Sequence, residues 1–378
     1  MGGSQYQIKC ILDALLPLER YDICYLAHRV PRERTEPRYS LRKLGKGEGV
    51  PRMGYLVDAI PLYRELRRIR PDVIYQRVAC GYTGVAAYYA RRHGARMIWH
   101  VAHDADVMRA ALIDGGGRLR HFLEKRSVEY GIRHANHIVT QTAHQARLLD
   151  SEYRRPVDAI IPNFHPTPTE TIDKSGPLTV VWVANLKKWK QPDAFVRLAG
   201  ALLDLRDVKF VMVGAPSPAV ADQSWYAALM SSIKALPNLE YLGARSQEFV
   251  NELLARSHVF VNTSLHEGFA NTFIQAWMRE VPVVSLNVNP DDVFGRAQVG
   301  VHAGTEEVLH RAVRMLLTDP AMRRQYASAS RAYAFREHSF ENAILLSGLI
   351  ETGRVDSRAP DADSITGVLV NRAPRQQG

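Results

Sequence analysis

The sequence predicts an α/β protein built from two doubly wound, Rossmann-like domains that face a central cleft. Short apolar runs rich in β-branched residues alternate with amphipathic segments through the second half of the chain, and the alternation recurs less regularly in the first half. Strands that are apolar on both faces and alternate with helices are typical of a parallel sheet covered on both sides. A stretch rich in Pro and Thr separates the halves and predicts a hinge.

The apolar runs define the expected elements of each half. In the second half we expect strands over 178–184, 208–214, 238–243, 258–264 and 281–288, with helices over 192–205 and 247–257. In the first half we expect strands over 21–28, 71–77, 95–103 and 135–142, with helices over 81–94 and 122–134.

These elements divide the chain into five parts. We expect an N-terminal domain over 1–163, a linker over 164–177 and a C-terminal domain over 178–336. A last helix over 337–352 is expected to pack back on the N-terminal domain, and the polar tail 353–378 is expected to be disordered. Because binding loops follow the carboxyl ends of parallel strands, the residues after each apolar run are the functional candidates.

Composition limits the class of protein. With 46% hydrophobic residues among 378, the chain can bury substantial cores, yet no apolar run reaches the ~20 residues that span a bilayer. The N-terminus lacks the basic flank and apolar stretch of a signal peptide, which favours a cytoplasmic protein. Three cysteines without CxxC spacing argue against a disulfide framework or a zinc site.

The net charge of +10 limits the partners. Basic clusters at 29–46 and 64–71 would suit nucleic acid, anionic lipid or phosphorylated substrates. No zinc-finger or RRM signature accompanies them, so we expect no nucleic-acid partner. A solvated basic face and peripheral association with a membrane surface both remain open.

Two loops of the second half are suited to an anion. Lys187, Lys188 and Lys190 follow the first predicted strand and precede a helix, where cations are unfavourable unless an anion lies between them. After the strand at 258–264, Gly268 allows close backbone approach, and Asn271 or Thr272 is suited to cap the next helix. The amides of 268–272 would then point into the cleft, and two such loops on neighbouring strands suit a diphosphate.

The motifs "TSLHEGFANTFIQAWMREVPVVSL", "VVWVANLKKWKQPDAFVRLA" and "VKFVMVGAP" resemble those of retaining glycosyltransferases of the GT4 family (glycosyl transferases group 1), which have the GT-B fold. The resemblance covers nearly the whole chain, and its C-terminal motifs are the more specific. It implies that the C-terminal domain binds a nucleotide diphosphate sugar and that the N-terminal domain faces the acceptor.

The resemblance also implies roles for individual residues. Lys190 would neutralise the donor diphosphate, Glu267 would contact the donor sugar, and His103 would lie beside the transferred sugar. The remaining donor-binding candidates are the glycine loop, the lysine loop and the segment that follows Glu267: Gly2, Gly3, Asn185, Lys187, Lys188, Gly268, Phe269, Ala270, Asn271, Thr272 and Gln275.

The sequence departs from the family pattern in three places. Asn185 stands where the family often has an arginine, and Lys187 or Lys188 is expected to supply that charge. Gln275 replaces the second acid of the family's E-x7-E motif. The chain also begins at the glycine loop, so we expect the reading frame to extend upstream and encode the strand that normally precedes Gly2.

Two of these positions have purely structural alternatives. "TFIQ" (272–275) fits a capping box in which Gln275 bonds back to the helix cap. If Gln275 instead takes the family's ribose position, it accepts one neutral hydrogen bond where a carboxylate would accept a charge-assisted pair. His100 fits the strand before His103 almost as well, and Asp104 and Asp106 nearby would allow a metal. The resemblance implies protein cations instead, so we expect no metal and no cofactor.

We therefore expect a retaining hexosyltransferase that acts on a glycan or lipid-linked acceptor, in cell-surface polysaccharide or glycolipid synthesis. The alternatives are a sugar-nucleotide epimerase of the same fold, and a catalytically weak partner protein that binds nucleotide. A nicotinamide dehydrogenase is disfavoured because no GxGxxG opens a helix after a first strand.

Overall fold

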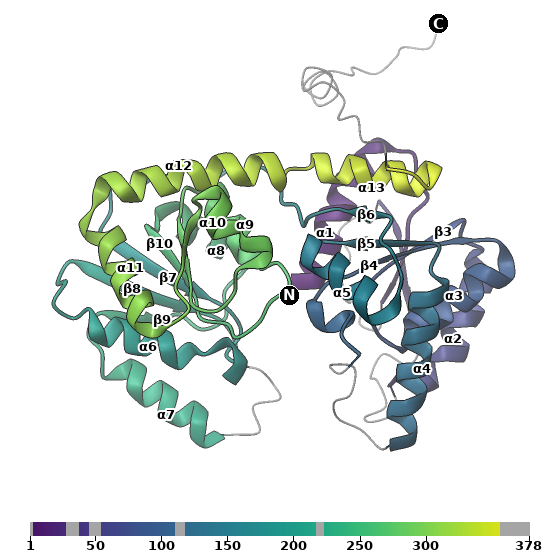
Figure 1. Ribbon diagram of the computed structural model, residues 1–378, viewed down its shortest axis with the longest axis horizontal. Coiled ribbons are helices and arrows are strands. Elements are labelled where there is room, and N and C mark those ends of the chain that lie inside the picture. Colours follow the sequence, from purple (N-terminus) through teal and green to yellow (C-terminus); the bar gives the residue numbers. More distant parts are fainter. Residues whose placement is uncertain (1–2, 28–37, 45–53, 110–117, 217–222, 356–378) are drawn as a thin grey trace, which may run out of the picture.

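The computed structural model describes residues 3–27, 38–44, 54–109, 118–216 and 223–355. Figure 1 shows two α/β domains side by side, with the C-terminal domain on the left and the N-terminal domain on the right. Within the described residues, no helix is long and apolar enough to cross a membrane.

The C-terminal domain is one parallel six-stranded sheet with helices on both faces. Its strands run in the order β12-β11-β10-β7-β8-β9, and every pairing is parallel. The strands are β7 (Leu178–Val183), β8 (Val208–Val213), β9 (Leu239–Tyr241), β10 (Val259–Asn262), β11 (Val283–Ser285) and β12 (Gly300–His302). All five strands that the sequence predicts here are confirmed, each within the predicted limits.

Two apolar cores cover the faces of this sheet. One core packs the sheet against α6 (Pro192–Ala201), α7 (Gln223–Lys234) and α11 (Glu306–Thr318). The other packs it against α8 (Gln247–Arg256), α9 (Asn271–Met278), α10 (Val293–Ala297) and α12 (Pro320–Glu337). Because both faces are largely covered, β7, β8, β10 and β11 are mostly apolar, which is why the sequence predicts them.

In the part of the N-terminal domain that the structure describes, the strands form two parallel sheets instead of one. Its strands are β1 (Cys24–Ala27), β2 (Ser40–Lys43), β3 (Val73–Arg77), β4 (Arg96–His100), β5 (His137–Thr140) and β6 (Ala159–Ile160). Four strands pair in the order β3-β4-β5-β6, and β1 pairs with β2 in a separate sheet. The helices are α1 (Gly3–Leu15), α2 (Gly54–Ile69), α3 (Gly81–His93), α4 (Arg118–His134) and α5 (Ala143–Tyr153). The four strands predicted in this half are confirmed, whereas β2 and β6 are short and have no clear apolar signature.

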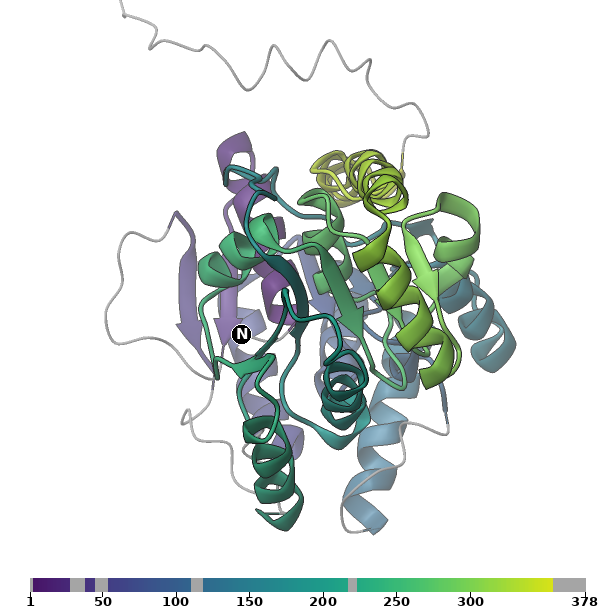
Figure 2. The ribbon, with the colours of Figure 1, turned by 90° about the vertical axis from the view of Figure 1, so that its left-hand side faces the viewer.

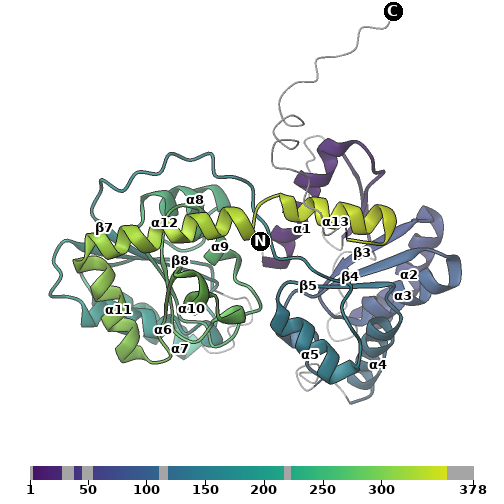
Figure 3. The same ribbon diagram turned by 45° about the horizontal axis from the view of Figure 1, so that its top comes forward.

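The end of the described chain joins the two domains. Figures 1 and 3 show α12 along the C-terminal domain and α13 (Glu341–Thr352) continuing across the N-terminal domain. Ala343, Leu346 and Leu349 of α13 pack in a core with side chains of α1. Of the tail expected to be disordered, residues 356–378 lie outside the described part.

The connection at 164–177 has no helix or strand, yet several contacts hold it in place. Arg279 pairs with Glu170 at 2.7 Å. The ammonium of Lys174 donates to the carbonyl oxygens of Leu254 at 3.0 Å and Ser257 at 2.6 Å. The segment therefore follows a fixed path along the C-terminal domain.

Candidate active site

A cavity of about 580 Å³ lies between the two domains at the carboxyl ends of their sheets. The segments around it come from both halves of the chain, as expected for two doubly wound domains. The N-terminal domain contributes Asp104, Thr142, Ala143, His144 and Arg147, and the C-terminal domain contributes 265–268, 287–292 and Arg296.

The chemical centre of the C-terminal side is an ion pair. Lys190, at the end of a 3₁₀ turn (Lys188–Lys190) after β7, donates from Nζ to Oε1 of Glu267. The hydroxyl of Ser264 donates to the same oxygen at 2.9 Å. Only 14% of the Lys190 side chain and 13% of the Glu267 side chain are exposed. Burial lowers the pKa of Lys190, and the neighbouring carboxylate opposes that shift.

Buried hydrogen bonds fix the loop of Lys190 against the loop of Glu267. Trp182 Nε1 donates to the Thr263 hydroxyl at 2.9 Å, and that hydroxyl donates to the carbonyl oxygen of Lys190 at 2.7 Å. The amide of Leu265 donates to the carbonyl oxygen of Trp189 at 2.9 Å. The ion pair is therefore held by backbone contacts between the loops that follow β7 and β10.

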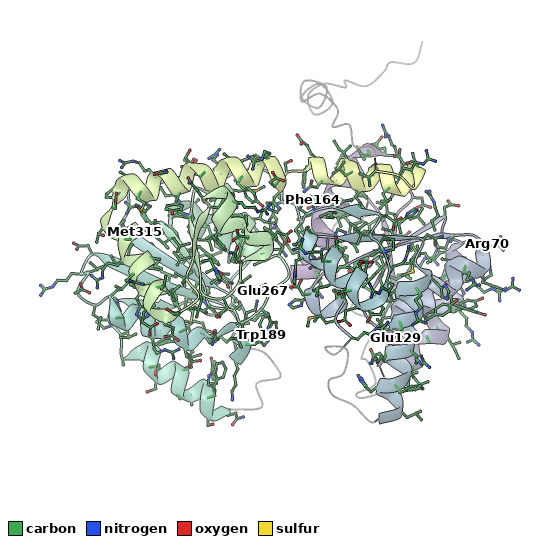
Figure 4. All side chains as sticks on the ribbon, viewed as in Figure 1. Arg70, Glu129, Phe164, Trp189, Glu267 and Met315 are labelled. Carbon is green, nitrogen blue, oxygen red and sulfur yellow. The ribbon has the colours of Figure 1, made fainter. Side chains whose placement is uncertain are left out.

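Aromatic rings extend this centre toward the N-terminal domain. The Trp189 ring stacks on His266 with centroids 5.1 Å apart and an interplanar angle of 8°. The Lys190 ammonium lies 4.1 Å from the Trp189 ring centroid. Figure 4 shows Trp189 and Glu267 on the side of the C-terminal domain that faces the N-terminal domain. The His266 ring meets His103 across the domains, at 5.7 Å.

The structure separates the two candidate histidines. His103 lies at the cleft, and its Nδ1 accepts from the amide of Ala105 at 3.1 Å, so Nε2 carries the proton in the neutral ring. His100 is buried in the core, where Nδ1 lies 2.8 Å from the Tyr75 hydroxyl. Burial, assisted by Arg77, lowers the pKa of His100 well below its ordinary value. His103 alone of these two is placed to meet a ligand.

The two acidic side chains beside His103 accept hydrogen bonds from other groups of the protein. Asp106 Oδ2 accepts from the amides of Ala102 at 2.8 Å and His103 at 3.0 Å. Asp104 Oδ1 accepts from Gln145 Nε2 at 3.0 Å. Across the described ranges there is no group of three or more His, Cys, Asp or Glu side chains arranged for a metal ion.

Two glycines lie at close contacts between the domains. A Cβ on Gly268 would lie 3.2 Å from both the Ala102 carbonyl oxygen and the Cα of His103. A Cβ on Gly3 would lie 2.9 Å from Nδ2 of Asn271, which donates to the Gly3 carbonyl oxygen at 3.1 Å. A larger residue at Gly268 would require the backbone at Ala102 and His103 to shift by a few tenths of an ångström, whereas at Gly3 the Asn271 side chain would have to move. Gly2, the other glycine of the predicted loop, lies outside the described residues.

The predicted capping of helix α9 is wrong. The residue before the helix is Ala270, which makes no side-chain cap, and Asn271 is already the first helical residue. Asn271 Oδ1 instead accepts from Gln7 Nε2 at 2.8 Å and from His165 Nε2 at 3.1 Å. These contacts join the two domains, so a partner from the N-terminal domain replaces the local cap. Thr272, the second helical residue, is half-buried.

Gln275 does not close a capping box either. It is the fifth residue of α9, only 2% exposed, and its Nε2 donates to Oδ1 of Asn251 on α8 at 2.9 Å. With the amide nitrogen engaged, the carbonyl oxygen is the atom that would accept a bond from a ligand.

The remaining candidate donor-binding residues lie in different environments. The Lys187 ammonium lies 5.6 Å from the Trp189 ring. The exposed Lys188 places its ammonium 6.0 Å from the Trp225 ring, and Asn185 is exposed. The side chains of Phe269 and Ala270 are buried, and the Phe269 carbonyl oxygen accepts from Asn163 Nδ2 at 3.3 Å.

The sequence analysis did not identify several residues that the structure places beside the ion pair or the cavity. Trp189 and His266 flank predicted residues, and an aromatic ring between Lys188 and Lys190 is a signal that could have found the first. Asp291 gives no such signal. Its carboxylate accepts from the amides of Ala143 at 2.7 Å and His144 at 2.8 Å, at the N-terminus of α5 in the other domain.

Comparison with known proteins agrees with this geometry. The family model described as Glycosyl transferases group 1 matches residues 177–319. A D-inositol 3-phosphate glycosyltransferase of Corynebacterium diphtheriae is 26% identical over 161 residues, 41% of this chain and 38% of that protein. The matched stretches cover 28% to 38% of the length of the curated relatives.

Solved structures share the fold over nearly the whole chain. A sucrose-phosphate synthase from Thermosynechococcus elongatus has a TM-score of 0.73 at 13% identity, covering 92% of each chain. WaaG, a glycosyltransferase involved in lipopolysaccharide biosynthesis, has a TM-score of 0.70 at 15% identity, covering 93% of this chain and 97% of its own. Anabaena Alr3699/HepE, solved with UDP and glucose, has a TM-score of 0.68 at 14% identity, covering 93% of this chain and 96% of its own. The architecture is thus GT-B.

Proposed function

This chain carries a group 1 glycosyltransferase domain in a GT-B architecture, and from that premise we propose that it is a retaining GT4-type enzyme. It moves a sugar from a nucleotide diphosphate sugar, bound by the C-terminal domain, to a glycan or lipid-linked acceptor on the N-terminal side. The reaction breaks the bond between the sugar's anomeric carbon and the diphosphate, so charge develops on the leaving phosphate.

The observation that carries this proposal is the largely buried ion pair of Lys190 and Glu267 beside the cleft. A buried cation stabilises developing phosphate charge far better than an exposed one, because water does not screen it. When a donor diphosphate binds, Lys190 turns part of its charge toward it, and an oxygen of Glu267 becomes free to accept hydroxyl groups of the sugar. Free amides of the loop after Glu267 add neutral donors.

His103 serves the acceptor side of the same reaction. Its Nε2–H is directed by the Ala105 bond on Nδ1, and its ring meets His266 above the ion pair. A neutral imidazole donor there would bind a hydroxyl of the transferred sugar. We assign no carboxylate as a covalent nucleophile, because Lys190 and Ser264 hold the one at 267. Retention would then follow from departure of the diphosphate on the face where the acceptor arrives, with the leaving phosphate taking the acceptor's proton.

The setting of the reaction is also part of the proposal. We place the enzyme on the cytoplasmic side of a membrane, in cell-surface polysaccharide or glycolipid synthesis, with the basic N-terminal domain against anionic lipid. Arg67 and Arg68 in the last turn of α2 belong to one basic cluster, whereas most of the cluster at 29–46 lies outside the described residues. Sedimentation with vesicles of phosphatidylglycerol and with neutral vesicles tests this: equal, weak binding to both would contradict it.

A donor panel tests the activity itself. Purified protein is incubated with nucleotide diphosphate sugars of different base and sugar, with and without lipid-linked and glycan acceptors, and nucleoside diphosphate release is measured. Release that needs an acceptor, with the anomeric configuration of the donor kept in the product by NMR, is the expected result. Conversion of the donor to an epimer without acceptor would favour an epimerase, and binding without turnover would favour the non-catalytic partner. The same assay in excess EDTA should give unchanged rates, since the chemistry is assigned to protein groups.

A further inference from the structure

The loop that follows Glu267 is held from the other domain by two buried hydrogen bonds in series. Arg77, the last residue of β3, donates from Nη2 to Oδ1 of Asn163 at 2.9 Å. Asn163 donates in turn from Nδ2 to the carbonyl oxygen of Phe269 at 3.3 Å. Arg77 is 6% exposed and Asn163 is 3% exposed, so water competes little for these bonds. The chain connects the carboxyl end of the N-terminal sheet to residues 268–272, here called the donor loop.

The backbone around Asn163 is held by the end of the described chain. His338, in the turn between α12 and α13, donates from Nδ1 to the carbonyl oxygen of Asn163 at 2.7 Å. Asn342 of α13 donates from Nδ2 to the carbonyl oxygen of Pro162 at 3.2 Å. Figure 2, turned so that the C-terminal domain faces the viewer, shows α12 and α13 nearly end-on, and Figure 4 labels Phe164 near the junction of the domains. Asn163 is therefore fixed at its backbone, and its side chain connects the two domains.

The two partners of Asn163 determine which way its amide group points. A guanidinium can only donate hydrogen bonds, and a carbonyl oxygen can only accept them. Turning the amide over would place Nδ2 against the guanidinium and Oδ1 against the Phe269 carbonyl oxygen, with donor facing donor and acceptor facing acceptor. The charge on Arg77 also polarises the amide, which makes its N–H a stronger donor. Arg77 therefore sets the direction in which Asn163 donates.

The bond to Phe269 fixes one peptide plane of the donor loop. A trans peptide is planar, and its N–H points opposite to its C=O. With the Phe269 carbonyl oxygen directed at Asn163, the N–H of Ala270 points away from Asn163. Ala270 precedes α9, which has no side-chain cap, and among the described residues no acceptor bonds the Ala270 amide. In the proposed function this amide is one of the donors to the diphosphate.

Stabilisation of the fold does not explain why Arg77 is buried. Its Nε has no hydrogen-bond partner, and in the described part of the chain no carboxylate pairs with its guanidinium. The neighbouring side chains are neutral: burial raises the pKa of Tyr75 to about 12, and burial lowers the pKa of His100, the residue opposite Arg77 on β4. A buried cation without an anion is costly, and an apolar residue of similar size is often at least as stable. A role in directing Asn163 accounts for the residue where stability does not.

We propose that Arg77 and Asn163 are positioning residues of the donor loop. Arg77 directs the side-chain amide of Asn163, and Asn163 holds the peptide between Phe269 and Ala270 so that its N–H stays available to the donor diphosphate. Both residues act through this chain of hydrogen bonds and not through contact with the donor. The inference rests on the proposed function, because the loop is a donor site only if the chain binds a nucleotide diphosphate sugar.

Binding of nucleoside diphosphates tests the positioning role separately from the proposed function. UDP, GDP and ADP are titrated in turn into the wild-type protein by calorimetry, and the one that binds most tightly is carried through the variants. If none of the three binds the wild type, the proposed function fails and the inference fails with it. If the wild type binds and the variants at 163 bind equally well, only the positioning role is overturned.

Two substitutions at 163 separate orientation of the loop from simple pairing with Arg77. Asn163→Leu is similar in shape but cannot donate to Phe269, and we expect its Kd to rise roughly 5- to 10-fold. Asn163→Asp still accepts from Arg77, now as an ion pair, but presents no N–H to Phe269. It should keep a Tm close to that of the wild type and still bind more weakly. Wild-type affinity of Asn163→Asp would mean that Asn163 serves only to pair with Arg77. Because Asn163→Leu changes no charge, weaker binding in both variants cannot come from added negative charge.

A matched control excludes general destabilisation. Asn238 also donates from Nδ2 to a backbone carbonyl oxygen, that of Ala199 at 2.9 Å, but it lies just before β9 at the amino edge of the C-terminal sheet. Asn238→Leu should lower Tm and leave Kd unchanged. A rise in its Kd as large as that of Asn163→Leu would show that any lost hydrogen bond weakens binding, which would overturn the proposal.

A double-mutant cycle tests whether Arg77 acts through Asn163. Arg77→Met should raise Kd by a factor similar to that of Asn163→Leu, without a loss of Tm, because it removes an unpaired buried charge. The protein that carries both substitutions should bind no more weakly than Asn163→Leu alone, since either one breaks the same chain. Multiplying losses would show that the two residues act separately and would overturn the chain.

Discussion

The two domains share a doubly wound architecture but use it differently. The C-terminal domain has an unbroken sheet, and β10, which leads to Glu267, is buried at every residue. Its two ligand loops are linked by a chain of buried hydrogen bonds from Trp182 through Thr263 to Lys190. The N-terminal domain has an interrupted sheet and reaches the site through His103 and Gly3. In the proposed function, the C-terminal domain carries the chemistry of the diphosphate, while the N-terminal domain positions the acceptor.

The largest expected effect lies in the C-terminal domain. Lys190→Ala should lower kcat/KM by roughly 100-fold or more, because it removes a charge-assisted contact to the leaving group. The control is Lys209→Ala, which removes an exposed lysine of β8 and should leave kcat/KM unchanged. Steady-state kinetics measures both. Wild-type turnover of Lys190→Ala at saturating donor would show that the diphosphate is neutralised elsewhere.

A smaller effect in the same domain concerns the ribose. Gln275→Glu should tighten nucleoside diphosphate binding by roughly 5- to 30-fold, because a carboxylate accepts two charge-assisted bonds where the amide oxygen accepts one neutral bond. We expect kcat to stay within a fewfold. Calorimetry of both forms measures the difference. Unchanged affinity together with a lower Tm would mean that Gln275 serves only its bond to Asn251.

The N-terminal contribution should be weaker and of a different kind. His103→Ala should lower kcat roughly tenfold while the donor KM stays within a fewfold, since a single neutral hydrogen bond to the transferred sugar is lost. His134→Ala, at the end of α4 and remote from the cleft, provides the matched control. A large rise in the donor KM of His103→Ala would contradict the proposal that the N-terminal domain acts on the acceptor side and the C-terminal domain binds the donor.

The smallest effect is expected at the junction of the domains. Burial lowers the pKa of His165 to about 3 and of His338 to about 4. Both values lie below the ~6.5 of an unfolded chain, so the unfolded state binds more protons as the pH falls from about 6.5 to 4. Stability present above pH 6.5 is therefore lost across that window, and Tm should fall by roughly 5 °C.

Substitution at the junction sharpens the pH prediction. The ring of His338 donates from Nδ1 to the Asn163 carbonyl oxygen at 2.7 Å, a bond that the amide of His338→Asn can partly replace. This variant should show a flatter dependence of Tm on pH between 6.5 and 4 than the wild type. His302→Asn, an exposed position on β12, should keep the full slope. Equal slopes in all three proteins would assign the acid sensitivity to other groups.

The sequence by itself determined the alternation of elements and the loops that hold the ligand residues. Parallel strands buried on both faces are mostly apolar, so the sequence alone predicts β7, β8, β10 and β11 as strands. Lys190 and Glu267 lie in the loops that follow β7 and β10, and their proximity could be expected because parallel strands end at one edge.

Only the tertiary structure decided which partner each polar group takes. Asn is a residue type that often caps helices, yet Asn271 is the first helical residue, and Gln7 and His165 from outside the C-terminal domain bind its side chain. His100 and His103 are equivalent by sequence, and burial against Tyr75 separates them. Asp291 caps a helix nearly 150 residues away in the chain. Hydrogen bonds between side chains distant in sequence depend on how two domains meet, and local periodicity carries no information about that meeting.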